Sequence, residues 1–195
     1  MARVSSLARR ALALVCAACL LLAAVGAGAD EVTVPVNLQV ELLGRIVRYE
    51  RTFAAEATPI TLLVVSRTNA PECVRVSSQL TAELRRAGRI GGRVITVSAA
   101  AYTTPAALRA QVGSSHARLV YLGAGLGRDV PAIATALGGA GVITVAAVGA
   151  DVDRGAVVGF ELVSSRPRIV VNLAAARAQR LQFNAQFLRL ARIVQ

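Results

Sequence analysis

The stretch ITLLVV, residues 60–65, decides the fold class of this chain. It is an almost continuous apolar run rich in β-branched side chains, which favour extended backbone. Such a run is typical of a strand that is covered on both faces, as the strands of a parallel sheet are. Three more runs follow it, at residues 93–97, 118–122 and 142–148. The sequence therefore predicts a buried, mostly parallel central sheet.

Helical signals separate these predicted strands. The helices are expected to open at Pro71, at Thr104-Pro105 and at Asp129, and to end near Gly88, Val112 and Leu137. In the first of them, Val74, Leu80 and Leu84 are spaced to face inward. Asp129 is expected to cap its own helix by accepting hydrogen bonds from the free amides of the first turn. Strands that alternate with helices predict an α/β fold with helices on both faces of the sheet.

A further helix is predicted before the first strand, over residues 36–49. Leu38, Leu42, Ile46 and Tyr49 recur there at helical spacing and form one apolar stripe. The chain therefore begins with an amphipathic helix whose apolar face can pack on the sheet.

After the fourth strand the pattern changes from parallel to antiparallel. Residues 157–162 and 168–171 alternate about a turn at residues 164–167, which predicts a hairpin at the edge of the sheet. We therefore expect a single three-layer α/β domain with a mostly parallel central sheet, an antiparallel C-terminal hairpin, helices on both faces and a helical tail.

The tail carries two asparagine caps. Asn172 is expected to cap a short helix over residues 173–178, and Asn184 a last helix near the C-terminus. An apolar stripe on the last helix should cover the sheet, and its members are Phe187, Leu190, Ala191 and Val194. The tail region presents its arginines outward, where a partner could bind. The candidate partner-binding residues are Arg166, Arg168, Arg177, Arg180, Arg189 and Arg192.

The first residues have the features of a signal peptide. These are Arg3, Arg9 and Arg10 at a basic start, an apolar run over residues 11–25, and the small residues 27–29 at a cleavage signature. The apolar run is shorter than a membrane-spanning helix. We therefore expect residues 1–29 to be cleaved, and residues 30–195 to be one α/β domain exported to a bacterial periplasm.

Cleavage would lower the net charge from +11 to +8, because three arginines are removed. An anionic partner, such as membrane headgroups or an acidic protein surface, would explain so basic a chain. However, the arginines are scattered and no lysine accompanies them, which favours a GC-rich coding bias. No nucleic-acid partner is expected outside the cytoplasm.

The stretch GAGLGRD, residues 123–129, joins a predicted strand to a helix and raises the question of a nucleotide-binding loop. The dinucleotide fingerprint needs a third small residue where Arg128 stands, and the acidic residue expected after the next strand is missing. The glycines favour a tight turn, or a close approach by a small ligand. We expect no bound cofactor.

Polar side chains follow the predicted strands at the end where such sheets bind ligands. The candidate ligand-binding residues are Ser66, Arg67, Asn69, Tyr102, Gly123 and Gly125. Neither a metal cluster nor a nucleophile with its base is evident, because Cys73 would be the only cysteine of the mature chain and His116 its only histidine. We therefore expect a binding protein without a metal, and no enzymatic activity.

Several stretches of the chain resemble the YfiR-type periplasmic regulator family (DUF4154-like). They are the closing RPRIVVNLAAARAQRLQFNAQFLRLARIV (residues 166–194), the opening VPVNLQVELLGRIVRYE (residues 34–50), and the ordered YLGAGL, VITVAAVGADVDRG and VGFEL between them. The resemblance implies a secreted α/β regulator. The family's type member binds the periplasmic part of an inner-membrane diguanylate cyclase and thereby lowers cyclic-di-GMP output.

The chain departs from the type member in two respects. Cys73 has no partner in the mature chain, whereas the type member carries paired cysteines, so disulfide-dependent control is not expected. The opening helix also lacks an aromatic-rich character, which leaves a sensor kinase open as the partner in place of a cyclase.

The sequence therefore predicts a periplasmic protein that binds, and represses, an inner-membrane signalling protein by protein–protein contact. The alternative is a small-molecule binding module that uses the loops at the carboxyl ends of the strands. A small ligand and a second copy of the chain stay open as additional partners.

Overall fold

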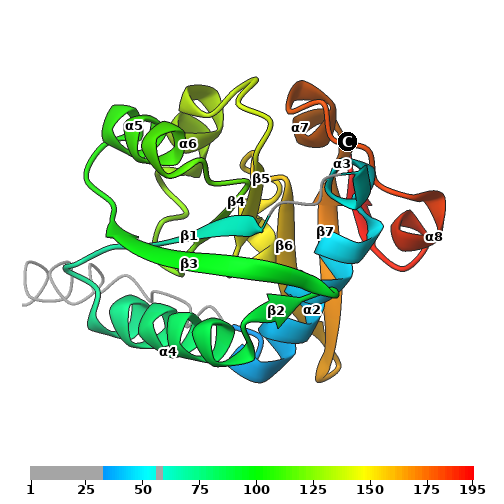
Figure 1. Ribbon diagram of the computed structural model, residues 1–195, viewed down its shortest axis with the longest axis horizontal. Helices are drawn as coiled ribbons and strands as arrows, with labels where there is room; N and C mark the ends of the chain where they lie inside the picture. Colours follow the sequence, from blue (N-terminus) through cyan, green and yellow to red (C-terminus); the bar gives the residue numbers. More distant parts are fainter. Residues whose placement is uncertain (1–32, 56–58) are drawn as a thin grey trace, which may run out of the picture. The chain divides into compact units, whose positions relative to one another are not determined.

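The computed structural model describes residues 33–55 and 59–195, so the expected signal peptide lies outside the described residues. An eight-stranded sheet forms the centre of this part, in the order β2-β3-β1-β4-β5-β6-β7-β8 (Figure 1). Its strands are β1 (Ile60–Ser66), β2 (Arg89–Ile90), β3 (Arg93–Ala101), β4 (Leu119–Leu122), β5 (Ile143–Ala146), β6 (Val158–Val163), β7 (Arg166–Asn172) and β8 (Arg192–Val194). The helices are α2 (Val36–Tyr49), α3 (Arg51–Ala55), α4 (Pro71–Ala87), α5 (Pro105–Ser115), α6 (Val130–Ala136), η1 (Gly149–Asp151), α7 (Leu173–Ala178) and α8 (Ala185–Leu188).

The middle of the sheet is parallel. β1 pairs in parallel with β3 on one side and with β4 on the other, and the parallel pairing continues through β5 to β6. β7 is antiparallel to β6, and β8 returns in parallel to β7. The predicted mostly parallel sheet with an antiparallel C-terminal hairpin is therefore confirmed.

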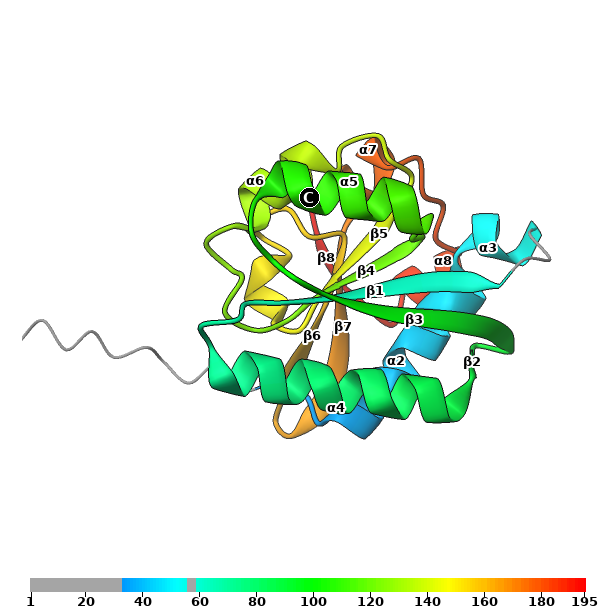
Figure 2. The same ribbon diagram turned by 60° about the vertical axis from the view of Figure 1, so that its left-hand side comes forward.

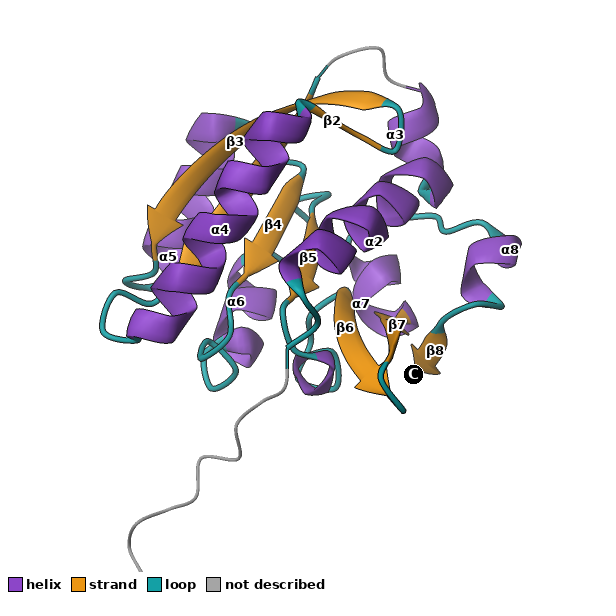
Figure 3. Cartoon of the chain, turned by 90° about the horizontal axis from the view of Figure 1, so that it is seen from below, coloured by secondary structure: helices purple, strands orange, loops and turns teal. Residues whose placement is uncertain are grey.

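Successive side chains of a strand point to opposite faces, and here both faces are buried. On β1, Leu62 and Val64 join the core that α2 and α4 cover, whereas Leu63 and Val65 join the core that α5 and α6 cover. Figure 2 shows α2 and α4 below β1 and β3, with α5 and α6 above them. Figure 3, from below, shows α4 and α2 lying across the sheet. These are the three layers that the sequence predicts.

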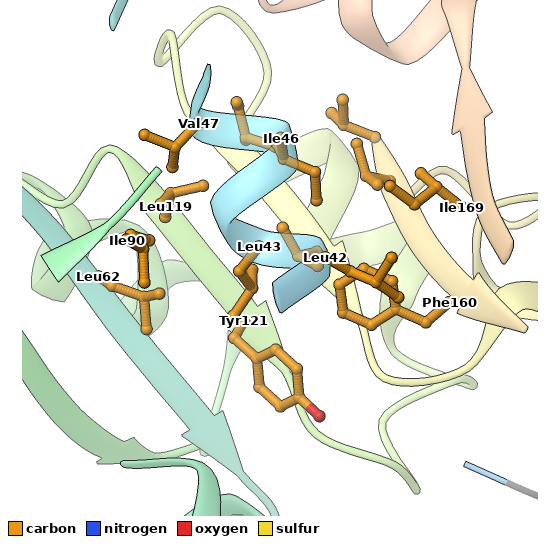
Figure 4. Packing of buried hydrophobic residues seen from close by; sticks show 14 of the residues in the cluster. Leu42, Leu43, Ile46, Val47, Leu62, Ile90, Leu119, Tyr121, Phe160 and Ile169 are labelled. Atoms are coloured by element: carbon orange, nitrogen blue, oxygen red, sulfur yellow. The ribbon is translucent and has the colours of Figure 1, made fainter. Parts of the chain in front are cut away.

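Helix α2 closes the larger of the two cores. Leu42, Leu43 and Ile46 project from it toward the central strands, where they pack in the same cluster as Leu119 and Phe160 (Figure 4). All five side chains are at most 5% exposed. Burial of an aliphatic or aromatic side chain contributes about 1.5–3 kcal/mol, so this face supplies a large part of the stability.

A buried polar pair fixes α2 on the sheet. Gln39 and Tyr121 are both fully buried. The Tyr121 hydroxyl donates to Gln39 Oε1 at 2.6 Å, and Gln39 Nε2 donates to the Val34 carbonyl at 2.6 Å. Burial raises the pKa of the Tyr121 hydroxyl well above its ordinary value, so it is a donor at any physiological pH. The helical spacing predicts α2 but not Gln39, because a glutamine at this position is ordinarily expected to face water.

The predicted caps are formed at three helices. Thr104, Asn172 and Asn184 each accept a hydrogen bond in the first turn of α5, α7 and α8, from the amides of Ala107, Ala175 and Gln186 respectively. α4 ends at Gly88, whose φ of 61° is the left-handed conformation that glycine adopts without strain.

The second predicted strand is longer than residues 93–97, because β3 continues to Ala101 and the two-residue β2 precedes it. The prediction that Val74 faces inward is wrong. The buried stripe of α4 contains Cys73, Ser77, Leu80 and Leu84, and Val74 lies one residue around the helix at 36% exposure. The apolar pattern of the sequence did not reveal this stripe, because two of its members, Cys73 and Ser77, are small side chains and not aliphatic ones.

The predicted helical tail is only partly correct. α8 has a single turn, and the chain then forms β8, which pairs in parallel with β7 through Val170↔Arg192 and Val171↔Ile193. The hairpin is therefore not at the edge of the sheet, and Leu190 is 65% exposed where we expected a core position. Strand pairing prevails because β7 offers unpaired backbone groups and Ile193 and Val194 are β-branched.

The hairpin turn is tighter than predicted. Ser164 and Ser165 have φ values of 49° and 62°, so two residues with positive φ connect β6 to β7. Arg166 and Pro167, which were expected in the turn, are the first residues of β7. A two-residue turn of this kind matches the twist of the two strands that it joins.

We expect Tyr121→Phe to lower the free energy of unfolding by about 1–3 kcal/mol, because the Gln39 amide oxygen would stay buried without its donor. Urea denaturation monitored by circular dichroism measures this change. Tyr49→Phe is the matched control, since the Tyr49 side chain is only half-buried and should tolerate the loss with little change. Equal losses in the two variants would contradict a specific role for the buried pair.

Candidate functional site

The carboxyl ends of β1, β3 and β4 lie next to one another at the same end of the parallel strands. Most of the predicted ligand-binding residues therefore come together there. The Tyr102 amide donates to the Ser66 carbonyl at 2.8 Å, and the Gly123 amide donates to the Val65 carbonyl at 2.9 Å. Arg67 follows Ser66 at the same end. Asn69 stands apart on an exposed turn before α4.

Arg67 is the centre of this strand-end cluster. Its guanidinium pairs with the Asp129 carboxylate, donates from Nε to the Gly125 carbonyl at 3.3 Å, and lies 5.8 Å from the centre of the Tyr102 ring. Burial of the ring and the neighbouring Asp129 raise the pKa of the Tyr102 hydroxyl, while Arg67 opposes the shift. The charge of Arg67 is therefore already compensated within the chain.

The expectation that Asp129 caps its own helix is wrong, because its side chain accepts no hydrogen bond from the first turn of α6. The carboxylate turns to Arg67 instead, across the loop from β1. A charge-assisted hydrogen bond with a guanidinium is stronger than a hydrogen bond with a neutral amide. This explains why the Asp129 carboxylate pairs with Arg67 and not with the amides of its own helix.

The glycines of the loop after β4 serve packing and turning. A Cβ atom on Gly123 would lie 2.8 Å from Ser77 Oγ and 2.9 Å from Cys73 Sγ, so only glycine lets α4 approach this loop. Gly125 has a φ of 87°, a conformation that favours glycine. Of the two sequence interpretations, a tight turn and a close ligand approach, these contacts support the tight turn.

A groove of about 250 Å³ opens beside the cluster, between α4 and the ends of β1 and β3. Its polar lining residues are Ser66, Ser77, Ser78, Thr81 and Arg85. The Ser77 hydroxyl is buried, and within residues 33–55 and 59–195 it has no hydrogen-bond partner. Sequence reasoning missed Ser77, although two small polar residues four apart on a buried helix face, Ser77 and Thr81, were the available signal.

Asp151 is a second buried acid at the carboxyl end of the sheet. It is 1% exposed, and its Oδ1 accepts a hydrogen bond of 2.7 Å from Arg154 Nη1. Burial raises the pKa of the Asp151 carboxyl, and the Arg154 guanidinium opposes this shift. His116 ends α5 just before the amino end of β4, so the parallel sheet separates it from Asp151. No group of three metal-binding side chains occurs in the described part of the chain.

The predicted partner-binding arginines are spread over the C-terminal elements. Arg166 and Arg168 lie on β7, Arg177 and Arg180 at α7, Arg189 directly after α8, and Arg192 on β8. Arg168 and Arg192 share the Glu161 carboxylate, at 2.6 and 3.4 Å respectively. Arg192 is half-buried, with 34% of its side chain exposed.

An apolar groove lies where α2, β7 and α8 meet. Leu42, Tyr49, Ile169, Phe187 and Leu190 form its apolar surface, and its volume is about 70 Å³. Arg45, Pro167 and Arg168 complete the lining. We call this feature the tail groove. It was not predicted, because its members come from three segments that are far apart in the sequence.

One stacked and one tilted aromatic contact, together with one carboxylate, hold α8 in this place. The Tyr49 and Phe187 rings are 5.8 Å apart, and the Phe183 and Phe187 rings 5.3 Å. Glu50 is fully buried, and its carboxylate accepts hydrogen bonds from the Phe53 and Gln182 amides, each at 3.0 Å. These contacts hold α8 in one position, so the tail groove has a defined shape.

Family comparison covers most of the chain. The family model DUF4154, described as YfiR/HmsC-like, matches residues 37–192. No curated protein sequence matches the chain. None of the helices in residues 33–55 and 59–195 has the length and apolar character that a membrane crossing requires.

Solved structures share the fold at low sequence identity. A conserved domain protein of Vibrio cholerae O1 biovar El Tor has a TM-score of 0.62 at 15% identity, over 85% of this chain and 61% of that one. An ABC domain in complex with L-Trp from Streptococcus pneumoniae has a TM-score of 0.55 at 11% identity, over 69% and 56%. A ligand-free, open substrate-binding protein with adhesive properties from Clostridium difficile has 0.53 at 15%, over 74% and 58%. The chain thus spans about six-tenths of the length of each.

We expect the stability of the protein to fall as the pH rises from the ordinary carboxyl pKa of 3.8 through the raised pKa of folded Asp151. In this window the folded state keeps a proton that the unfolded chain has released. Asp151→Asn removes this contribution, so its free energy of unfolding relative to wild type should increase with pH across the window. Urea denaturation at a series of pH values measures the slopes, with exposed Asp153→Asn as the control. Parallel slopes in wild type and Asp151→Asn would contradict this assignment.

Proposed function

The chain belongs to the YfiR/HmsC-like family, and we propose that it is a periplasmic regulator that binds the periplasmic part of an inner-membrane signalling protein and represses it. A diguanylate cyclase or a sensor kinase is the partner class. The observation that carries this proposal is the tail groove, where the exposed Leu190 and arginines lie around an apolar hollow.

The size of the tail groove suits a protein partner better than a metabolite. Small-molecule sites usually enclose about 300–1,000 Å³, whereas this groove has about 70 Å³. A volume of this kind accepts one aliphatic or aromatic side chain. Protein interfaces concentrate their binding energy in such central pockets, surrounded by a polar rim.

The rim of the tail groove favours an acidic partner surface. Arg45 is exposed at one wall, and Arg166 is exposed on the same strand as the lining residue Arg168. Neither Arg45 nor Arg166 forms an ion pair in the described part of the chain. The overall positive charge adds a long-range attraction that accelerates encounter with an acidic surface.

The groove divides five of the six predicted partner-binding arginines into two groups, and the sixth, Arg192, is paired with Glu161. Arg166 and Arg168 lie on β7 beside the groove, and Arg189 is the neighbour of Leu190. We place the partner on this group. Arg177 and Arg180 lie at α7, which stands apart from α8 in Figures 1 and 2. We therefore do not place them in the proposed partner-binding surface.

A small-molecule binding module is the second candidate function. The groove beside Ser66 supports it, because the buried Ser77 hydroxyl lacks a partner and could bond a polar ligand. Two of the similar structures are an ABC domain in complex with L-Trp and a substrate-binding protein. Arg67 is a weaker ligand contact than the sequence suggested, since Asp129 already pairs with it.

We expect Leu190→Asp to weaken capture of the partner at least tenfold, which corresponds to about 1.4 kcal/mol. An acidic residue would place an unpaired charge against the apolar contact, and Leu190 is exposed enough for the fold to tolerate the change. The measurement is quantitative pull-down of the cyclase or kinase from solubilised inner membranes with the tagged mature chain.

Val74→Asp is the matched control for this experiment. Val74 is 36% exposed on α4 and does not line the tail groove. Retained binding by Leu190→Asp, or an equal loss in both variants, would overturn the placement of the partner. Failure of the wild-type chain to recover any membrane signalling protein would overturn the proposed function.

The second candidate predicts that a polar metabolite raises the melting temperature of the wild-type chain and does not raise that of Ser77→Ala. Binding to the native state stabilises it, and alanine removes the hydroxyl without adding an atom to the buried site. Without ligand, Ser77→Ala should be as stable as wild type or more so, because an unsatisfied buried hydroxyl disappears. A thermal-shift screen of amino acids, nucleotides and organic acids measures this. Absence of any stabilising compound would remove this candidate.

A further inference from the structure

The end of the sheet where the parallel strands begin carries five exposed arginines. They come from four separate elements, α3, β2, α5 and the region of α7, and they are Arg51, Arg89, Arg109, Arg177 and Arg180. Within residues 33–55 and 59–195, none of the five forms an ion pair. We call these five residues the basic rim.

Contacts between neighbouring elements place the first part of the basic rim along this end. Arg93, at the start of β3, donates to the Phe53 carbonyl in α3. Arg118, directly before β4, donates from Nη2 to Thr52 Oγ1 at 3.3 Å. Figure 3 shows α3 and β2 at this end, opposite the arrowheads of β3 and β4. The starts of β3 and β4 are therefore joined through α3.

The same end of the sheet continues to α7. Arg109 donates to the Ala136 carbonyl at the end of α6, and the next carbonyl, that of Leu137, accepts from Gln179 Nε2 at 2.8 Å. Gln179 directly follows α7, so α5 and α7 lie at the same end of α6. With about 4.8 Å between neighbouring strands, the basic rim extends over roughly 20 Å.

The carboxyl ends of the same strands have a different balance of charge. Asp129, Asp151 and Glu72 follow strands at that end, and each forms an ion pair with an arginine. Positive charge without compensation is therefore concentrated at the amino ends. Such a separation of charge orients the domain toward an anionic surface.

A hollow of about 310 Å³ opens in the basic rim. Arg109, His116 and Arg118 are its charged or titratable lining residues, and small or aliphatic residues complete the lining. Among the lining residues none is acidic. The volume is at the lower end of the range of about 300–1,000 Å³ for small-molecule sites, which suits one phosphate headgroup.

The carbonyl groups at the end of α5 would repel an anion in this hollow if they were free. The Ala117 amide donates to the Val112 carbonyl at 3.1 Å, and the Ser115 hydroxyl donates to the Gln111 carbonyl at 2.7 Å. These hydrogen bonds reduce the negative field that the end of a helix produces.

We propose that the basic rim docks on a bilayer surface that contains anionic phospholipids, with one headgroup phosphate in the hollow beside Arg109. Charge complementarity selects this occupant. Protein interfaces and single-stranded nucleic acids both use exposed aromatic side chains, as anchors or for stacking. None of the aromatic side chains in the described part of the chain is exposed. Each basic residue near an anionic bilayer strengthens binding about fivefold, so five arginines give reversible docking.

The inference goes beyond the proposed function and does not depend on it. Capture of a partner from solubilised membranes requires no bilayer, and docking of the basic rim requires no protein partner, so the two can fail separately. Docking also gives a role to Arg177 and Arg180, which lie outside the proposed partner-binding surface.

The test is co-sedimentation of the untagged mature chain with phospholipid vesicles. Vesicles of phosphatidylcholine alone are compared with vesicles of equal parts of phosphatidylcholine and phosphatidylglycerol. We expect binding only to the vesicles with phosphatidylglycerol, and weaker binding at high salt, because salt screens exposed charges. Arg89→Glu and Arg177→Glu, at the two ends of the basic rim, should each weaken binding roughly tenfold or more, since each replaces an attraction by a repulsion.

Arg128→Glu is the matched control, because it changes the net charge by the same amount at the other end of the sheet. Arg128 is exposed in the loop before α6 and forms no ion pair with the described residues. Its substitution should change binding by less than about twofold, since it lies beyond the Debye length of about 8–10 Å from the bilayer. Circular dichroism checks that each variant is folded.

Three results would overturn the proposal. A wild-type chain that does not bind vesicles with phosphatidylglycerol leaves the basic rim to an acidic protein. An equal loss of binding in Arg128→Glu shows that only the net charge matters. Undiminished binding by Arg89→Glu or Arg177→Glu removes that end of the basic rim from the contact and contradicts docking along its whole length.

Discussion

The buried carboxylate of Glu50 is the contact on which the arrangement of the C-terminal part depends. A carboxylate removed from water is tolerated only where hydrogen bonds replace its hydration. Here the Phe53 amide, in α3, donates a hydrogen bond to one carboxylate oxygen of Glu50. The Gln182 amide, in the C-terminal tail, donates to the other oxygen. The Asn184 amide adds a bond to the Tyr49 carbonyl. One residue at the end of the first helix therefore positions a segment more than a hundred residues later in the chain.

The position of α2 is in turn set by the sheet, so the tail groove depends on the core. Gln39 bonds to Tyr121 of β4, and this pair determines how α2 lies over the central strands. Leu42 and Tyr49 on the same helix form one wall of the groove, while Ile169 of β7 forms another. A groove whose walls belong to packed elements is preorganised, which reduces the entropy lost on binding. The proposed docking surface is thus a consequence of core packing.

Sequence patterns predicted the elements that short-range physics determines. The helix predicted over residues 36–49 was correct at both ends, because an amphipathic stripe and a preceding proline define it. The cap at Asn172 was correct for the same kind of local reason. β8 was missed because its stability comes from pairing with β7, a contact that no local pattern reveals. The tail groove and the Arg67–Asp129 pair were missed for the same reason, since each joins residues that are distant in the sequence.

The distribution of charge explains why binding should occur at the sides of this sheet and not at the carboxyl ends of its strands. In open α/β sheets, ligands usually bind where strands end and backbone groups are free. In this chain Arg67, Asp129 and Tyr102 satisfy one another there, and Asp151 is paired with Arg154. A ligand would have to break an ion pair before it gained one. The tail groove requires no such exchange, because it offers apolar surface. Protein–protein binding is therefore the function that requires the fewest existing ion pairs to be broken.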